Sequence, residues 1–401
     1  MSFKKTVLLL LIFFPILSAH AQTVENVGSE STLDIATWNI EWFGSSSNGP
    51  SNDNVQISNA EAIISGSGID LWGVQEIADG DDFDDMIASL GGDFDGVLAT
   101  NSVEQKVGFI YNTNVIQVRQ VKHILESFSS AFASRPPLQL EANVILPDTT
   151  VIVTFIVLHM KAFSDLSSYE RRVDASSRLK NHIDFTSLDG EQVIVLGDFN
   201  DELERSTSSG RTSPYDNFVQ DPDNYFFLTL PLEQSGEGSF CTTSSCNSTG
   251  SMLDHILVTD ELFSDYVSNS AGFIPDLTSD ISVFGNTTSD HLPVIASFDF
   301  TQIGTSVDDI EEQPTTISLE APFPNPFSNS TTLSVNLAEP AHVKIEVFNM
   351  LGQHVDTLVD QMQSPGSYEH SFIADSLPPG VYMIRISSGN FAKTVPVTLL
   401  Q

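Results

Sequence analysis

Two polar side chains interrupt an apolar segment near the start of the chain, in the stretch TWNIEWFG at residues 37–44. In a strand, Asn39 and Glu41 point the same way, roughly 7 Å apart at about 3.3 Å of rise per residue. Trp38 and Trp42 then share the opposite face, which is apolar. Taken alone, the polar pair is best explained by a strand face that meets water. The rest of the chain must indicate whether the pair does chemistry instead.

Polar side chains also end several later segments predicted to be strands, among them LWGVQEI, VIVTFIVLH and VIVLGDFND. The full set is Glu76, His159, Lys161, Asp198, Asn200, Asp254, Asp290 and His291. One such residue alone is usually a turn residue or a structural histidine. Together they place carboxylates, an amide and two imidazoles at strand ends, where α/β proteins bind ligands. Several carboxylates without a thiolate cluster indicate a hard divalent ion, Mg²⁺, Mn²⁺ or Ca²⁺.

Strand-like and helix-like segments alternate over residues 33–300 and would position these side chains. Strands are expected at residues 34–43, 70–77, 106–112, 138–146, 151–163, 191–200, 252–260 and 292–300. Helices are expected at residues 59–68, 83–92 and 169–187, the last with an apolar stripe of Val173, Leu179 and Ile183. The acidic stretch ADGDDFDD at residues 78–85 is predicted to be a solvated loop, because it lacks the spacing of a calcium loop. This alternation predicts a mixed α/β domain whose sheets are covered by helices.

The C-terminal part of the chain has a different character. Residues 301–318 are acidic and polar, include Pro314, and are predicted to be a linker. Residues 319–401 contain only short alternating strands separated by turn residues. This pattern predicts a small immunoglobulin-like β-sandwich.

Residues 1–21 have the features of a secretory signal peptide cleaved after Ala21: a charged start, an apolar stretch and the ending AHA. No later segment reaches membrane-spanning length, so we expect a soluble, monomeric mature protein outside the cytoplasm. Cys241 and Cys246 are an even pair in an exported chain, so a disulfide is permissible as a local clip on a surface loop. The sequence leaves open whether they are bonded, and a zinc site lacks further ligands.

The 401-residue chain is strongly acidic, with Lys+Arg 16, Asp+Glu 53 and a formal net charge of −37. Such a surface repels nucleic acid at long range. The acidic residues are spread along the chain, which we interpret as adaptation of the surface to salt or to solubility. A halophilic or marine host is the inference that follows. At 1 M salt the Debye length is about 3 Å, so the repulsion is screened. A local basic patch of Arg135, Arg171, Arg172, Arg178 and Lys180 is one possibility, and a salt-bridged helix face is the other.

The motifs TWNIEW, QE, LHMKA, GDFN, LDH and SDHLP follow one another in the order typical of the endonuclease/exonuclease/phosphatase superfamily. Over residues 33–300 the chain resembles this superfamily, which has the deoxyribonuclease I-like fold. The resemblance implies a four-layer α/β sandwich, in which two packed β-sheets are flanked by helices. It also implies cleavage of phosphodiester or phosphomonoester bonds with a divalent metal, Mg²⁺ or else Mn²⁺ or Ca²⁺.

The resemblance implies a metal site and a phosphate contact. Glu76 corresponds to the main metal ligand. Asn39 and Glu41 correspond to the first-strand pair that supports the metal and its waters, and Asp290 to a carboxylate near it. Lys161 is expected to contact phosphate or simply to be solvated.

The resemblance also implies the groups that act on water and on the leaving oxygen. Asp198 and Asn200 correspond to the pair that orients the attacking water and contacts the phosphate. His291 corresponds to the essential histidine, and Asp254 to the carboxylate that orients it and fixes its tautomer. His159 corresponds to a second histidine that protonates the leaving oxygen, unless a metal-bound water does so. Whether His291 or Asp198 activates the water is left open, and His182 and His255 are expected to be structural.

The C-terminal strands resemble the sorting domain of type IX secretion cargo of Bacteroidota-type bacteria. The resemblance is carried by APFPNPFSNSTTLSVNL, by VKIEVFNMLGQHVDTLV and by the stretch that begins LPPGVYMIRISS. It implies that the type IX secretion machinery is a partner and that the protein reaches the cell surface or the medium. An accessory carbohydrate-binding module is the alternative, but no convergent aromatic cluster supports it.

These observations favour a secreted, metal-dependent phosphodiesterase, first of all an extracellular nuclease acting on DNA or RNA. A second possibility keeps the site and changes the substrate, as in a sphingomyelinase-like or other organic phosphodiesterase or phosphatase. A third is a surface binding protein with an inactive nuclease fold. The presence of both Asp198 and His291 argues against that third possibility.

Overall fold

The computed structural model describes residues 24–101, 103–241, 244, 246, 250–302, 317–319, 322–338, 340–349, 354–374, 377–388 and 391–400. The predicted signal peptide at residues 1–21 lies outside the described residues, as does most of the predicted linker at residues 301–318. No helix in these described ranges is long and apolar enough to cross a membrane.

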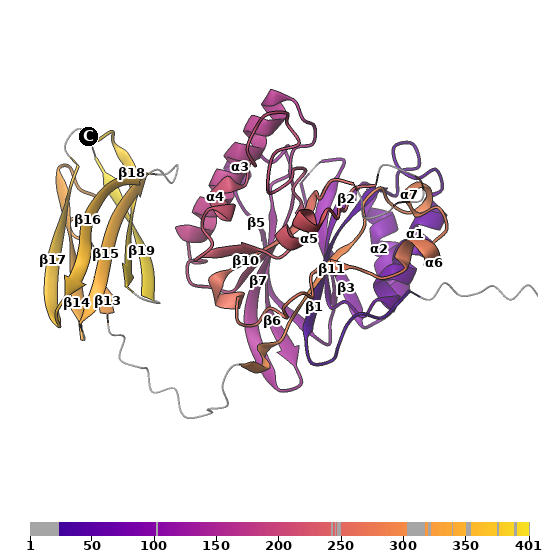
Figure 1. Ribbon diagram of the computed structural model, residues 1–401, viewed down its shortest axis with the longest axis horizontal. Helices are drawn as coiled ribbons and strands as arrows, with labels where there is room; N and C mark the ends of the chain where they lie inside the picture. Colours follow the sequence, from indigo (N-terminus) through magenta and orange to yellow (C-terminus); the bar gives the residue numbers. More distant parts are fainter. Residues whose placement is uncertain are drawn as a thin grey trace, which may run out of the picture.

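Two six-stranded mixed sheets lie face to face in the larger domain (Figure 1). The first has the order β11-β12-β1-β2-β4-β3. Its strands are β1 (Leu33–Phe43), β2 (Leu71–Ile77), β3 (Phe94–Leu98), β4 (Lys106–Asn112), β11 (Gly272–Phe273) and β12 (Val294–Phe298). The second has the order β5-β6-β7-β8-β10-β9. Its strands are β5 (Ile116–His123), β6 (Leu138–Leu146), β7 (Thr149–His159), β8 (Val193–Asp198), β9 (Tyr225–Phe227) and β10 (Asp254–Thr259).

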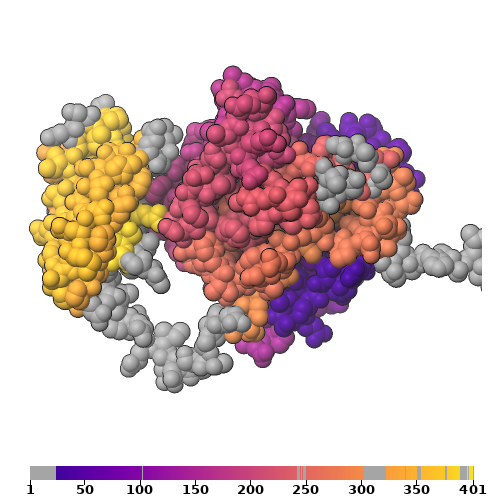
Figure 2. Space-filling model, in the orientation of Figure 1, coloured from indigo at the N-terminus to yellow at the C-terminus, as the bar shows by residue number. Residues whose placement is uncertain are grey.

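Only the central pairs β1–β2 and β7–β8 are parallel, and every other pairing in these two sheets is antiparallel. Strand β12 pairs with β1 although the two are far apart in the sequence. Indigo segments from the start of the chain and orange segments from late in the larger domain also lie side by side on the face drawn in Figure 2. The site motifs at both ends of the domain sequence are brought together by the pairing of β12 with β1.

The core between the sheets depends on a close approach at Gly73 of β2. Leu33, Phe155 and Leu196 are among the fully buried residues of this core. A Cβ atom at residue 73 would lie 2.1 Å from Leu196 Cδ1 and 3.2 Å from Val157 Cγ2. Because close-packed interiors leave no room for such an overlap, glycine is required here for the sheets to meet at this spacing.

Helices cover the outer faces of both sheets and complete four layers. On the first sheet, α1 (Asp53–Gly66) and α2 (Gly80–Leu90) bury Ile63 and Phe83 against Trp38. On the second sheet, α3 (Leu166–Asp184) buries Leu179 and Ile183. Short helices lie in the connections: η1 (Glu126–Phe128), α4 (Asp216–Val219), α5 (Leu230–Ser235), η2 (Asp260–Leu262), α6 (Leu277–Asp280), α7 (Phe284–Thr287) and η3 (Phe300–Gln302). The expected four-layer α/β sandwich is confirmed.

The C-terminal strands form two antiparallel sheets, as expected for a small β-sandwich. One sheet holds β13 (Ile317–Leu319), β14 (Ser330–Leu337) and β17 (Gly366–Ile373). The other holds β15 (Ala341–Asn349), β16 (His354–Gln363), β18 (Gly380–Ser388) and β19 (Phe391–Leu399). Leu333, Val343 and Phe372 belong to the core that joins them.

The alternation of β1 breaks at its carboxyl end. Glu41 and Trp42 have φ angles of +34° and +48°, and the pairing with β2 shifts register between Asn39 and Phe43. Phe43, and not Trp42, therefore joins Trp38 in the apolar layer under the helices. The expectation that Trp42 packs beside Trp38 is wrong, because a bulge moves every later side chain to the opposite face.

Helix α2 begins three residues before the expected helix at residues 83–92, because its first turn is polar. Helix α2 begins at Gly80, since the Asp79 side chain accepts hydrogen bonds from the Asp81 and Asp82 amides, at 2.8 and 3.1 Å. The acidic stretch at residues 78–85 is therefore not a loop but the start of a helix, where negative charge is stabilising. In α3, Val173 is 39% exposed, so its assignment to the apolar stripe is also wrong.

A fully buried ion pair fixes the loop between β7 and α3. The Arg172 guanidinium bonds the Asp201 carboxylate, with Nη2–Oδ2 at 2.8 Å and Nε–Oδ2 at 2.9 Å. Its Nη1 atom donates to the carbonyl oxygens of Lys161 at 2.7 Å and Phe163 at 2.8 Å. Arg172 therefore contributes to the position of this loop and is absent from the surface.

We predict that Arg172→Met lowers the free energy of unfolding by about 3–5 kcal/mol, because it leaves the Asp201 charge buried and unpaired. Arg119→Met is the control: Arg119 pairs with Glu141 at 2.6 Å, but its side chain is 44% exposed. The control should change the unfolding free energy by less than about 1 kcal/mol. Urea denaturation followed by circular dichroism measures both, and similar losses in the two variants would contradict the prediction.

Candidate active site

Polar ends of strands from both sheets meet at one edge of the sandwich. His159 of β7, Asp198 of β8 and Asp254 of β10 are neighbours in register across the second sheet. Asn39 and Glu76 come from the adjacent strands β1 and β2 of the first sheet. His291 lies three residues before the start of β12, so the structure brings together side chains that are up to about 250 residues apart in the sequence.

Asn39 connects the two halves of this site. Its amide Nδ2 donates to Glu76 Oε1 at 3.2 Å and to Asp198 Oδ2 at 3.0 Å. Its Oδ1 accepts a hydrogen bond from the Glu41 backbone amide at 3.0 Å. Asn39 therefore positions the carboxylates through its nitrogen and does not turn its oxygen toward them. Asn200 adds a second amide, with Nδ2 donating to Asp198 Oδ2 at 3.0 Å.

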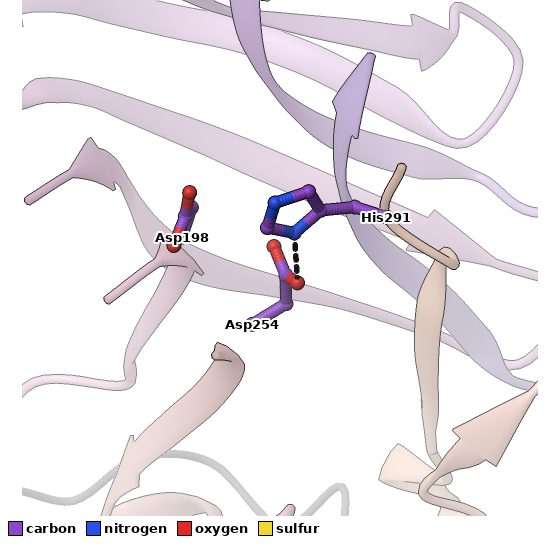
Figure 3. A group of neighbouring side chains, drawn as sticks. All are labelled: Asp198, Asp254 and His291. Atoms are coloured by element: carbon purple, nitrogen blue, oxygen red, sulfur yellow. Dashed lines mark hydrogen bonds and ion pairs between the residues drawn. The ribbon is translucent and has the colours of Figure 1, made fainter. Parts of the chain in front are cut away.

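Asp254 and His291 form a buried acid–imidazole pair (Figure 3). The Nδ1 atom of His291 lies 2.6 Å from Asp254 Oδ2. The Ser239 hydroxyl donates to the same carboxylate oxygen at 2.6 Å. Burial alone would lower the pKa of His291, but the charges of Asp254, Asp198 and Asp290 raise it well above its usual value. With Nδ1 engaged, Nε2 is free to act on a substrate and lies 3.9 Å from Asp290 Oδ1.

His159 has the opposite electrostatic character. Its side chain is 2% exposed, with Nε2 lying 3.7 Å from Glu76 Oε1 and 3.5 Å from Asp198 Oδ2. Burial first, then the positive charges of Arg135, His291 and Lys161, lower its pKa well below the usual value. The two imidazoles therefore differ: His159 is held neutral, and His291 is held as a cation.

Glu41, Glu76, Asp198 and Asp290 have no lysine or arginine partner within the described residues. Burial raises the pKa of Glu41 to about 8 and that of Asp198 to about 7, and it also raises those of Glu76 and Asp290. Glu41 Oε2 is buried with no hydrogen-bond partner.

Clustered carboxylates of this kind fit a divalent cation, which offsets charge that the protein leaves uncompensated. Asp198, Asp254 and His291 each offer an atom within 4.8 Å of the others. Asp254 is already bonded to His291 and Ser239, however. Glu41, Glu76 and Asp290 adjoin this group closely enough to act on one another's pKa through their charges, and Glu41 Oε2 has no hydrogen-bond partner. Carboxylate oxygens of this kind suit Mg²⁺ or Ca²⁺.

Several backbone positions at the site are strained. Glu41, Trp42, Glu76 and Asn200 all have φ between +34° and +61°. Side chains other than glycine rarely adopt this conformation, and such strain clusters at functional sites. Here it turns the strand ends out of the regular pleat and toward one another.

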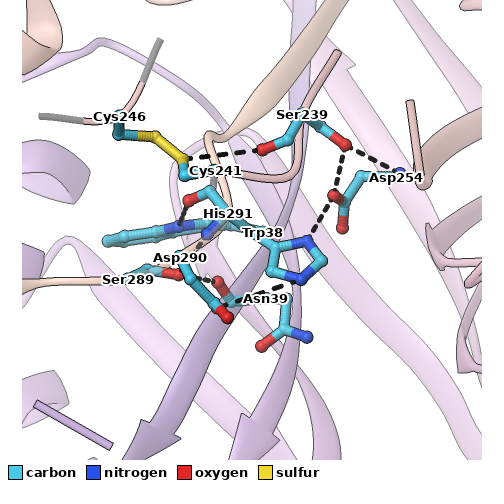
Figure 4. The surroundings of a disulfide bond; sticks show 9 residues. All are labelled: Trp38, Asn39, Ser239, Cys241, Cys246, Asp254, Ser289, Asp290 and His291. Atoms are coloured by element: carbon cyan, nitrogen blue, oxygen red, sulfur yellow. Dashed lines mark hydrogen bonds and ion pairs between the residues drawn. A yellow bond between two sulfur atoms is a disulfide. The ribbon is translucent and has the colours of Figure 1, made fainter. Parts of the chain in front are cut away.

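A disulfide lies directly behind His291 (Figure 4). Cys241 and Cys246 are bonded, and both are buried rather than on a surface loop. The Cys241 amide donates to the Asp290 carbonyl at 2.7 Å, and Trp38 Nε1 donates to the His291 carbonyl at 3.0 Å. The clip therefore supports the segment that presents the site residues.

Sequence reasoning did not identify the serines that hold this segment. The Ser239 hydroxyl donates to the Asp254 carboxylate, as described, and accepts a hydrogen bond from the Asp254 backbone amide at 3.0 Å. Ser289 donates its hydroxyl to the Asn39 carbonyl at 2.6 Å and accepts the His291 amide at 2.9 Å. The Ser of SDHLP was visible as part of a motif, whereas nothing in the sequence near Ser239 points to its role.

The basic residues that could have formed one patch have two different environments, salt-bridged on a helix face or beside the site. Arg178 pairs with Asp174, and Lys180 pairs with Asp184 and Asp221, as in the salt-bridged alternative. Arg135 and Arg171 line a cavity beside the site together with Lys161. His255 is structural as expected, bonded through Nδ1 to Thr229 and through Nε2 to the Asp201 carbonyl.

Residues 36–291 match the endonuclease/exonuclease/phosphatase family, in keeping with the four-layer fold described above. The chain belongs to that family of phosphoester hydrolases. Residues 321–397 match the secretion system C-terminal sorting domain, so the chain also carries a type IX sorting domain. No curated protein matches the chain.

Solved structures with a similar fold include three relatives of low identity. An endonuclease/exonuclease/phosphatase from Bacteroides vulgatus is 16% identical over 67% of this chain and 98% of its own, with a TM-score of 0.49. The mannosyl-6-phosphatase of Bacteroides thetaiotaomicron is 15% identical over 67% and 100%, with a TM-score of 0.45. The human Nocturnin catalytic domain with bound sulfate is 16% identical over 69% and 97%, with a TM-score of 0.47.

We predict that, in chelator, the thermal midpoint falls as pH rises from about 4.5 to 8. The folded-state pKa of Glu41 is raised from 4.5 to about 8, so its stabilising contribution is complete below 4.5 and is lost as pH approaches 8. Glu41→Gln should flatten this decline, and Mg²⁺ at pH 8 should raise the midpoint more in the wild type. Scanning fluorimetry measures this, with Glu141→Gln as the control, since Glu141 is a partly exposed carboxylate whose partner is Arg119. Equal slopes in all three proteins would contradict the prediction.

Proposed function

We propose that the chain is a secreted, divalent-metal-dependent phosphodiesterase, and specifically an extracellular nuclease that hydrolyses DNA or RNA. The observation that carries this proposal is the buried Asp254–His291 pair, which adjoins unpaired carboxylates where the two sheets meet. A binding protein with no catalytic role would not need buried charges of this kind, because each of them costs stability.

The metal-holding residues in this proposal are Glu41, Glu76 and Asp290, with Asn39 positioning Glu76. Mg²⁺ is the first candidate, with Mn²⁺ or Ca²⁺ as alternatives. When bound, such an ion polarises a phosphoryl oxygen and offsets the charge that develops during hydrolysis.

Asp198 and Asn200 are assigned to the attacking water. Asp198 accepts a proton from water that attacks phosphorus in line, and a pKa near 7, raised by burial, suits a general base at neutral pH. The Asn200 side-chain amide donates to Asp198 Oδ2 at 3.0 Å. The same amide is assigned a contact with a phosphate oxygen. The amides of Asn39 and Asn200 both fix the carboxylate before the substrate arrives, so little reorganisation accompanies the reaction.

The two histidines are assigned complementary roles. Asp254 holds Nδ1 of His291, so the imidazolium presents Nε2–H to a phosphoryl oxygen and stabilises negative charge there. His159 keeps a neutral ring whose Nε2 lies 3.5 Å from Asp198 Oδ2 and 3.7 Å from Glu76 Oε1. It can donate a hydrogen bond to the departing oxygen, while a water supplies the proton that this oxygen takes up. Lys161 contributes a further positive charge toward the phosphate.

The place of action follows from the chain's ends. The stretch at residues 1–21 is proposed to direct export from the cytoplasm, and the sorting domain to engage the type IX machinery. The mature enzyme would then act as a monomer at the cell surface or in the medium. A salty environment would screen its net charge of −37 against a polyanionic substrate.

We predict metal-dependent turnover of a phosphodiester by the purified chain. The substrates to compare are plasmid DNA, RNA, methyl 4-nitrophenyl phosphate, sphingomyelin and a sugar monophosphate, each with Mg²⁺, Mn²⁺, Ca²⁺ or chelator across salt. His291→Ala should reduce kcat by at least about 100-fold, because it removes a positioned, charged hydrogen-bond donor. No turnover of any ester would overturn the enzyme assignment.

The matched control is His182→Ala, because His182 lies on the outer helix α3 and away from the carboxylates. This control should keep wild-type turnover. Activity of His291→Ala equal to that of His182→Ala would overturn the site assignment. Hydrolysis of sphingomyelin or of the sugar monophosphate, but of neither DNA nor RNA, would support the assignment of the site and overturn the proposal of a nuclease.

A further inference from the structure

A cavity of about 430 Å³ lies beside Glu76 and His159. Pockets that bind small ligands are typically about 300–1,000 Å³, so the volume of this cavity suits a group of the size of a nucleotide. Its lining includes three cations and two aromatic side chains: Arg135, Lys161, Arg171, Trp42 and Phe163. We call these five residues the basic–aromatic cleft.

Within the part of the chain that the structure describes, the three cations of this cleft form no ion pair with a carboxylate. The chain has only 16 Lys and Arg residues, and three of them meet here. Arg135 is 9% exposed, its Nη atoms donate to the Gln105 side chain at 2.7 Å and the Met160 carbonyl at 3.0 Å, and its buried Nε has no partner. Arg171 donates to the Ser130 carbonyl. These acceptors are neutral, so the positive charge stays available for an anion.

The pKa of Lys161 is consistent with this surplus of positive charge. Burial lowers that pKa first, and the neighbouring Arg171 and Arg135 lower it further. Like charges held together in this way cost free energy unless an anion joins them. The adjoining carboxylates of the proposed catalytic site belong to the metal-binding cluster and form no ion pair with these three residues.

Phe163 is exposed and yet held in place. Its side chain is 72% exposed, and its φ angle is +81°. The buried Arg172 guanidinium bonds the carbonyls of both Lys161 and Phe163, which keeps the strained loop fixed. A phenyl ring that contributes so little to the core, on a strained and anchored backbone, indicates a binding role.

Strain is concentrated around this cleft. Five cavity-lining residues have left-handed backbones: Trp42, Glu76, Ala133, Ser134 and Phe163. Ligand clamps are among the places where such conformations gather. The cavity wall is therefore shaped by the fold in advance, before any ligand is present.

We propose that the basic–aromatic cleft binds the nucleotide next to the scissile phosphate of a single-stranded nucleic acid. The flanking phosphodiester lies against Arg135, Lys161 and Arg171, and the base stacks on Phe163. Lys161 Nζ covers one face of this ring at 4.3 Å from the centroid, which leaves the other face for the base.

This inference rests on the proposed nuclease function and narrows its substrate. Stacking on Phe163 requires an unpaired base, so single strands are preferred over duplex. The same cleft disfavours the other phosphoesters. A choline headgroup is cationic and is repelled by the three basic residues, and a sugar monophosphate has no second phosphate to place there.

The test compares kcat/KM for a short single-stranded oligonucleotide with that for methyl 4-nitrophenyl phosphate, using the full chain. The wild type should prefer the single strand over the same sequence in a duplex. Phe163→Ala should lower the oligonucleotide-to-diester ratio at least about fivefold, the lower end for loss of one base–aromatic stack. Phe163→Trp should retain most of the ratio.

Phe128→Ala is the matched control. Phe128 is 38% exposed and has the Arg178 guanidinium over its ring at 3.7 Å, but it does not line the cleft. This variant should keep the wild-type ratio. Arg171→Gln tests the phosphate contact: the salt dependence of oligonucleotide KM should become shallower by about one unit of log–log slope. Circular dichroism confirms that each variant is folded.

The outcomes separate the two proposals. A wild type that hydrolyses the small diester and no nucleic acid overturns the nuclease function. An active nuclease whose ratio is unchanged in Phe163→Ala, or falls equally in Phe128→Ala, overturns the cleft alone. A wild-type preference for duplex likewise overturns it.

Discussion

The amide of Asn39 is the interaction on which the site depends. Packing between the two sheets is apolar and non-directional, so it brings strand ends near one another without fixing their orientation. One nitrogen bonded to Glu76 of its own sheet and Asp198 of the other supplies that direction. The remaining groups follow from register, because His159 and Asp254 flank Asp198 on neighbouring strands.

The local sequence pattern predicted most of the strands and most of the residues that meet at the site. The features that it missed depend on tertiary contacts. The strands ending in Glu76, His159 and Asp198 were predictable because each is a short apolar run that ends in a polar residue. The break at Trp42 was not, since a bulge is determined by the partner strand. Ser239 matters only because the fold brings it to Asp254, and no short-range signal reports such a contact. The start of α2 was not predicted for a related reason. Its cap is polar, and a polar cap lies outside the repeating pattern of apolar residues that indicates a helix.

The net charge of the chain is a poor guide to its local electrostatics. The overall acidity suggests a protein that repels polyanions, and at low salt it does so at a distance. At the site, however, a cluster of carboxylates adjoins three cations that form no ion pair with any described carboxylate. Within a Debye length these local arrangements, rather than the total charge, decide what binds.

Gly73 shows how a residue without a side chain can set the dimensions of an active centre. Leu196 belongs to β8, which ends at Asp198, and Gly73 belongs to the strand that leads to Glu76. A methyl group at residue 73 would act as a wedge between the layers, since Leu196 is fully buried and has no space to withdraw. The hydrogen bond from Asn39 to Asp198 joins the two sheets at the site, so we expect it to lengthen first. The distance between the site residues of the two sheets is therefore set by the packing of the core.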